Sequence, residues 1–100
     1  MVKHIVLWKL KGSAEGKSKE ENALELKAAL EGLKASIGEI RHLEVGRNFN
    51  PSDTAGDLSL YSEFMNREDL EKYQNHPEHL KVAAFVRKVT EERRVSDYET

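Results

Sequence analysis

The sequence predicts an α+β domain of the ferredoxin-like class, with a four-stranded antiparallel sheet that carries helices on one face. The chain has 100 residues, enough for one core, so we expect a single domain over residues 1–100. Segments with a two-residue apolar period and segments with a helical period alternate in the order βαββαβ. This order is that of the split βαβ arrangement.

The first predicted strand covers residues 2–11, VKHIVLWKLK. Alternation puts one set of side chains on a common face: Val2, His4, Val6, Trp8 and Leu10. The opposite face also has an apolar centre, Ile5 and Leu7. A sheet with only one covered face would not need this second apolar pair, so both faces are expected to be covered.

The first helix is predicted to follow a glycine-containing connector, residues 11–17. Ser18 and Glu21 have the spacing of a capping box. The apolar stripe of about five turns that follows consists of Ala23, Leu26, Leu30, Leu33 and Ile37. Gly38 is expected to end this helix in a left-handed conformation.

The next two strands are predicted over residues 40–49 and 57–65, separated by a loop with Asn, Pro, Asp and Gly at 50–56. The residues expected to face the helices are Leu43, Val45 and Phe49 from one strand, and Leu58, Leu60 and Phe64 from the other. Tyr61 and Met65 are expected on the opposite face.

The last helical unit is predicted as two segments. Asn66 can cap a short helix whose inward residues are Leu70 and Tyr73. Pro77 favours the first position of a new helix, so the chain is expected to break at 75–76 and restart there. The second apolar stripe consists of Leu80, Ala83, Ala84, Val86 and Val89. A short charged strand is expected over 92–99.

Composition limits the function classes. The net charge is -2 with no Lys/Arg run, so a nucleic-acid partner is not expected. The chain has no Cys, which excludes disulfides and thiolate metal sites. No segment is apolar enough for a signal peptide or a membrane span, so we expect a cytoplasmic protein without a membrane partner. No phosphate loop or dinucleotide fingerprint is present, and no cofactor is expected.

A homodimer is expected from the sheet face that the helices leave open. Its apolar residues are Ile5, Leu7, Tyr61 and Met65. A second copy packed face to face would cover them. The alternative is that these are scattered surface side chains, which are normal in monomers.

Three stretches carry a resemblance to a known family: residues 2–11, residues 43–53 (LEVGRNFNPSD) and residues 57–86. Within the last, the pattern Y-x-x-H-P-x-H is the most specific part. These stretches resemble the stress-responsive A/B barrel domain, or Dabb, family. The resemblance implies a ferredoxin-like protomer that pairs into a dimeric α+β barrel.

The family includes stress proteins without assigned chemistry and a plant cyclase that closes a linear polyketide by an intramolecular aldol condensation. Similarity to that cyclase implies a catalytic pair, Tyr73 and His79, and a further pocket histidine, His4. A histidine on the cyclase's third strand corresponds to Leu58, so the likeness is incomplete there. Trp8 is expected to form either a pocket wall or plain core.

The residue types suit cofactor-free acid/base chemistry. A neutral histidine can remove a proton from carbon, while a tyrosine hydroxyl can donate to the developing oxyanion. Structural roles remain open: His76 as a helix cap, and His4, Tyr73 and His79 as satisfied core groups. His76 and His79 do not supply the three converging ligands of a metal site, so none is expected.

Two functions from different classes therefore remain. One is a homodimer that binds a small hydrophobic or aromatic molecule in a pocket lined by His4, Trp8, Tyr73 and His79, with cyclase-like chemistry. The alternative is a non-enzymatic stress-response or structural dimer.

Four arginines, Arg41, Arg47, Arg93 and Arg94, could form an anion-binding patch if their strands bring them together.

Overall fold

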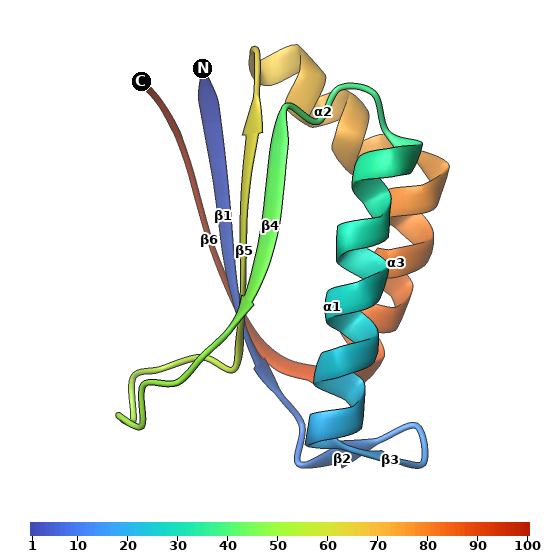
Figure 1. The fold of residues 1–100 in the computed structure, drawn as a ribbon, viewed down its shortest axis with the longest axis vertical. Helices are drawn as coiled ribbons and strands as arrows, with labels where there is room; N and C mark the ends of the chain where they lie inside the picture. Colours follow the sequence, from blue (N-terminus) through green and yellow to red (C-terminus); the bar gives the residue numbers. More distant parts are fainter.

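The computed structural model describes all 100 residues and has two layers, a sheet and a pair of long helices packed on one of its faces (Figure 1). The sheet contains β1 (Val2–Leu10), β4 (His42–Arg47), β5 (Leu58–Phe64) and β6 (Thr90–Glu99). Its strand order is β4-β5-β1-β6, and every neighbouring pair is antiparallel. The helices are α1 (Lys19–Ser36), α2 (Arg67–Asn75) and α3 (Pro77–Val89). The predicted ferredoxin-like topology is confirmed.

The core lies between the two layers and is built from the residues that the apolar periods predict. One face of β1 is buried along its whole length, and so is the matching face of β5. The predicted α1 stripe is buried as well: Ala23, Leu26, Leu30, Leu33 and Ile37. Burial of these side chains against the sheet is what fixes the strand register, because a one-residue slip would turn each strand over.

The start of α1 is as predicted, but its end is not. The Ser18 side chain accepts a hydrogen bond from the Glu21 N–H at 3.2 Å, and Glu21 accepts one from the Ser18 N–H at 3.1 Å. The helix ends at an extended Ile37, and Gly38 does not adopt the left-handed conformation expected of it. Among the glycines, that conformation occurs only at Gly16, in the turn between two short strands, β2 (Ser13–Ala14) and β3 (Lys17–Ser18).

β4 is shorter than predicted. It ends at Arg47, and Phe49 does not reach the core but is 99% exposed. The loop that follows projects away from the body of the domain (Figure 1). Its far end is fixed, because the Asp57 N–H donates to the Trp8 carbonyl at 2.7 Å and the Asp57 carboxylate accepts from the Leu10 N–H at 2.7 Å.

The break between α2 and α3 lies at His76, as the proline predicts. His76 has extended backbone angles and is both the C-cap of α2 and the N-cap of α3. Pro77 opens α3. One residue of the predicted α3 stripe is placed differently: Leu80 is 53% exposed and does not join the core.

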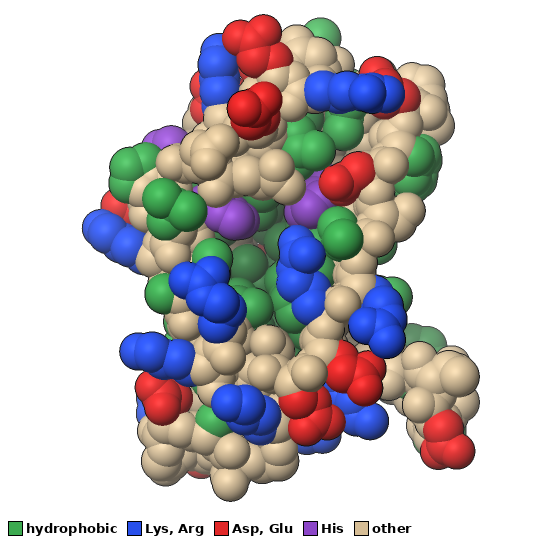
Figure 2. Space-filling view, turned by 180° about the vertical axis from the view of Figure 1, so that it is seen from behind, with side chains coloured by type: hydrophobic (Ala, Val, Ile, Leu, Met, Phe, Trp, Pro, Cys, Tyr) green, Lys and Arg blue, Asp and Glu red, His purple; other side chains and the backbone are tan.

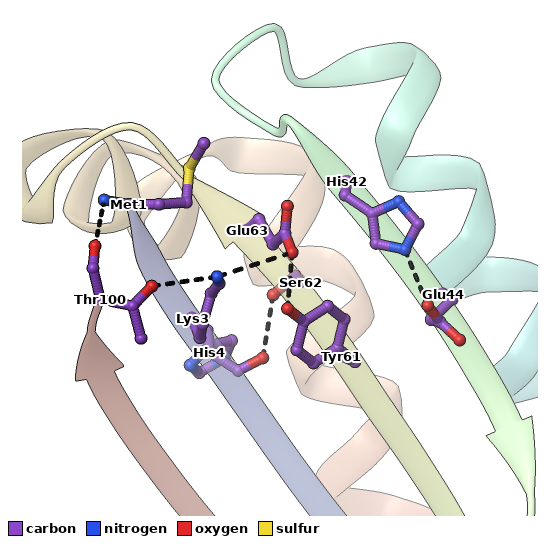
Figure 3. A network of polar contacts seen from close by, with 9 residues as sticks. All are labelled: Met1, Lys3, His4, His42, Glu44, Tyr61, Ser62, Glu63 and Thr100. Carbon is purple, nitrogen blue, oxygen red and sulfur yellow. Dashed lines mark hydrogen bonds and ion pairs between the residues drawn. The ribbon is translucent and has the colours of Figure 1, made fainter.

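The sheet face that points away from the helices is partly polar (Figure 3). Tyr61 donates to Glu63 at 2.5 Å, and Lys3 lies 4.0 Å from the same carboxylate. On this face Leu7 is 44% exposed, and nothing in the protomer covers it. β6, at the sheet edge, is exposed along almost its whole length. No helix in the chain is both long and apolar enough to cross a membrane.

Candidate functional site

A cavity of about 330 Å³ opens between the helix-facing side of the sheet and α3. In the space-filling view it is a hollow with a hydrophobic floor, bordered by histidine and by Lys/Arg side chains (Figure 2). Its apolar walls are formed mainly by Val6, Trp8, Leu30, Leu60, Val82 and Val86. All four residues of the predicted pocket line this cavity: His4, Trp8, Tyr73 and His79.

Tyr73 reaches the cavity from α2, a helix whose start is fixed by the Asn66 side chain accepting from the Asp69 N–H at 2.8 Å. The Tyr73 side chain is buried, and its ring packs on Phe64 with 4.9 Å between centroids. Burial raises the pKa of Tyr73 to about 12, although the charge of Arg93 acts in the opposite direction. The phenol therefore keeps its proton at neutral pH and can act as a hydrogen-bond donor.

His79 lies in the first turn of α3, with its ring centroid 4.5 Å from that of Tyr73. Burial is the main influence on His79 and lowers its pKa. The nearby Gln74 backbone acts in the opposite direction, while His4 and Arg93 lower the pKa further. The Nδ1 atom of His79 is buried and has no partner in the protein. The site thus holds a neutral imidazole with an unused ring nitrogen.

His4 forms the sheet side of the same cluster. It is almost fully buried on β1, and its ring meets that of Tyr73 edge-on at 6.2 Å. Its Nδ1 contacts a carboxylate oxygen of Asp97 on the neighbouring strand β6. Because a carboxylate can only accept, Nδ1 carries the proton in this contact, and Asp97 fixes the orientation of the ring.

Trp8 is both core and cavity wall. Its side chain is almost fully buried, and the indole Nε1–H is buried without an acceptor. Buried polar groups in proteins are nearly always paired, so an unpaired donor on a cavity wall is a candidate ligand contact. Leu58, where the resemblance places a histidine, is fully buried and does not line the cavity.

His76 is separate from this site. Its Nδ1 accepts a hydrogen bond from the Glu78 N–H at 3.1 Å, which is the predicted cap at the start of α3. It does not line the cavity. No group of three or more His, Asp or Glu side chains in the chain is arranged to hold a metal ion.

Two arginines at the cavity were not predicted as a pair. Arg87 from α3 and Arg93 from β6 both line it. The four-arginine patch considered from the sequence does not form: Arg94 falls on the opposite side of the sheet from Arg93, and Arg47 pairs with Glu20. Alternation along β6 predicts that Arg93 and Arg94 lie on opposite faces of the sheet. Which of them faces the cavity depends on the register of β6 against β1.

Fold and site together define a ferredoxin-like α+β protomer with a lined cavity between its two layers. The model of the stress responsive A/B barrel domain family, Dabb, matches residues 2–100. The chain belongs to this family. No match is found among curated proteins.

Solved structures support the same assignment. A dimeric protein of unknown function with a ferredoxin-like fold, from Bacteroides fragilis, is 40% identical, with a TM-score of 0.87 over 99% of this chain and 95% of that one. A Dabb family protein from Mesorhizobium loti is 25% identical, with a TM-score of 0.69 over 99% and 95%. A hydroxynitrile lyase from Passiflora edulis is 21% identical, with a TM-score of 0.80 over 97% and 90%, and shares the fold.

Proposed function

We propose that this protein binds a small hydrophobic or aromatic molecule in the cavity between sheet and helices, and moves protons on it without a cofactor. The observation that carries the proposal is the unpartnered, buried Nδ1 of His79 beside a tyrosine that keeps its proton. Such a pair has the base and the donor that enolisation of a carbonyl compound needs.

In this mechanism His79 removes a proton from the carbon next to a carbonyl group. The electron pair moves onto the carbonyl oxygen, where the Tyr73 hydroxyl stabilises the enolate by donating a hydrogen bond. The enolate carbon can then attack a second carbonyl of the same molecule, forming a carbon–carbon bond, as in an intramolecular aldol addition. The resulting alkoxide takes a proton back from His79. His4, oriented by Asp97, and Trp8 position the ligand.

We also propose that the protein acts as a homodimer. The Bacteroides fragilis relative, 40% identical, is described as dimeric. The exposed apolar surface on the outer face of the sheet includes Leu7 (44% exposed), Met65 (50%) and Tyr98 (44%). Pairing two sheets across this face would cover these side chains and give the dimeric α+β barrel.

The direct test of the chemistry is proton exchange on a simple ketone. Acetophenone is incubated with the protein in D₂O, and loss of the methyl proton signal is followed by NMR. We expect the wild type to accelerate exchange, and His79→Gln and Tyr73→Phe each to reduce the acceleration by about a hundredfold, a typical contribution of a positioned acid or base. His42→Gln is the matched control, because His42 lies on the outer face.

Binding is measured separately, by ligand-induced thermal shift with a set of aryl ketones. Binding without exchange would refute the catalytic assignment and keep the cavity as a binding site. If the protein shows neither binding nor exchange, the non-enzymatic dimer is favoured instead.

A further inference from the structure

Arg87 and Arg93 approach the cavity from different elements, the last turn of α3 and the edge strand β6. Neither side chain has a carboxylate within 4.0 Å, whereas Arg47 and Arg67 are both ion-paired, with Glu20 and Glu99. Both arginines are exposed, so their guanidinium groups are accessible to a ligand at the mouth. The blue side chains that border the hollow in Figure 2 show the charge of this rim.

The cavity lining has no acidic side chain that could balance the charge of the two arginines. It contains two arginines and two histidines but no Asp or Glu. Asp97, on the sheet beside His4, is already in contact with the His4 ring. A neutral ligand would leave the positive charge of the mouth uncompensated, while an anionic ligand would complement it.

The chemistry of the mouth distinguishes between anions. Guanidinium groups match the planar carboxylate with two parallel hydrogen bonds. Phosphate sites are commonly built on helix N-termini, where free N–H groups point at the ligand. Arg87 lies instead in the last turn of α3, where unpaired carbonyls carry partial negative charge that disfavours a dianion.

We propose that the ligand is a monocarboxylate with an aromatic or alkyl body, whose carboxylate is held at the cavity mouth by Arg87 and Arg93. The apolar body occupies the cavity and reaches the Tyr73–His79 pair. A volume of about 330 Å³ is at the lower end of the range for ligand pockets, roughly 300–1,000 Å³, and suits one ring with a short chain. This inference rests on the proposed binding function and adds the class of ligand to it.

The test uses a matched set of ligands: 4-phenylbutanoate, its uncharged amide, and 3-phenylpropyl phosphate. Affinities are measured by isothermal titration calorimetry at one fixed salt concentration. We expect the carboxylate to bind at least about tenfold more tightly than the amide. Arg93→Gln and Arg87→Gln should each remove most of this difference while leaving the affinity for the amide unchanged.

Arg94→Gln is the control, because Arg94 lies on the other side of the sheet, and it should change neither affinity. Raising the salt concentration should weaken binding of the carboxylate and not of the amide. Equal binding of carboxylate and amide to the wild type would overturn the inference and leave the cavity as a site for neutral ligands. Tighter binding of the phosphate would overturn the carboxylate assignment. If none of the three ligands binds, both this inference and the proposed binding function fail.

Discussion

Each side of the sheet has a tyrosine whose pKa is raised to about 12, for different reasons. Tyr73, on the helix side, is shifted by burial. Tyr61, on the outer side, is shifted mainly by the hydrogen bond that it donates to Glu63. The phenol of Tyr61 is thus already committed to a partner, while no protein carboxylate holds that of Tyr73. A raised tyrosine pKa therefore indicates a hydrogen-bond donor for a ligand only where burial causes the shift, and not where the hydroxyl already donates to a protein carboxylate.

The histidines differ in the same way. His42 lies on the outer face, half-buried, with its Nε2 2.8 Å from a Glu44 carboxylate oxygen. His79 is partly buried, with an unpartnered Nδ1. The outer face therefore satisfies its polar groups internally, and the helix face leaves a donor and an acceptor unused beside a cavity. This contrast supports the proposals that ligand chemistry belongs to the helix face and that self-association belongs to the outer face.

The largest expected effect is on the free energy of unfolding, and it comes from truncating Tyr73 rather than Tyr61. Tyr73→Ala should lower the free energy of unfolding by about 3 kcal/mol, because it removes a fully buried aromatic ring and leaves a cavity. Tyr61→Ala should cost less than about 1 kcal/mol in the protomer, as expected at a partly exposed position. Urea denaturation of both variants measures the difference. Equal losses would contradict the division between core and outer face.

A second substitution tests the outer face as the dimer interface. Leu7→Asp places a charge in the centre of that face and should weaken self-association at least about thirtyfold, or about 2 kcal/mol. Sedimentation equilibrium of the variant and the wild type measures this change. Phe49→Ser is a useful companion, because Phe49 is exposed on the projecting loop rather than on the sheet. A dimer that survives Leu7→Asp but not Phe49→Ser would move the interface to the loop.

A third measurement compares the histidines by pH titration. The pKa of His79 is lowered in the folded chain, while the unfolded value is about 6.5. Below that pH the unfolded chain binds more protons, so the stability contributed by His79 is present above about pH 6.5 and is lost as pH falls toward the folded pKa. NMR of the His79 Cε1–H signal should give a midpoint below 6.5. A midpoint at or above that value would refute the assignment of His79 as a neutral base.

The same titration has a stability readout. His79→Gln should flatten the fall in unfolding free energy below pH 6.5, because it removes the group that titrates differently in the two states. His42→Gln serves as the control on the outer face. An unchanged pH profile in the His79 variant would show that other groups set the acid sensitivity.

Much of this architecture could be predicted from sequence because burial on alternating positions determines which side chains face inward. The α1 stripe and the Pro77 break follow from local rules that tertiary contacts reinforce. Phe49 was misplaced because alternation continues in the sequence after the hydrogen-bonded ladder has ended at Arg47. The apolar pattern of β4 does not show where its hydrogen bonding to β5 ends.

The site was predicted in part, for a similar reason. The family resemblance points to His4, Tyr73 and His79, and the alternation of β1 adds Trp8 on the same face as His4; all four line the cavity. Arg87 was not singled out, since a charged residue in the last turn of a helix is ordinary surface chemistry. Its position opposite Arg93 depends on how α3 crosses the sheet, which no local pattern contains.

The extended residue at His76 has a consequence for how the proposed acid and base are held. In one continuous helix, the six steps from Tyr73 to His79 would rise about 9 Å and leave the two side chains about 240° apart in rotation, on different sides of the helix. The break folds them back to a ring separation of 4.5 Å. Tyr73 and His79 thus belong to two helices that meet at one extended residue. The spacing of the pair therefore depends on the backbone at His76, and a change there would alter that spacing without replacing either side chain.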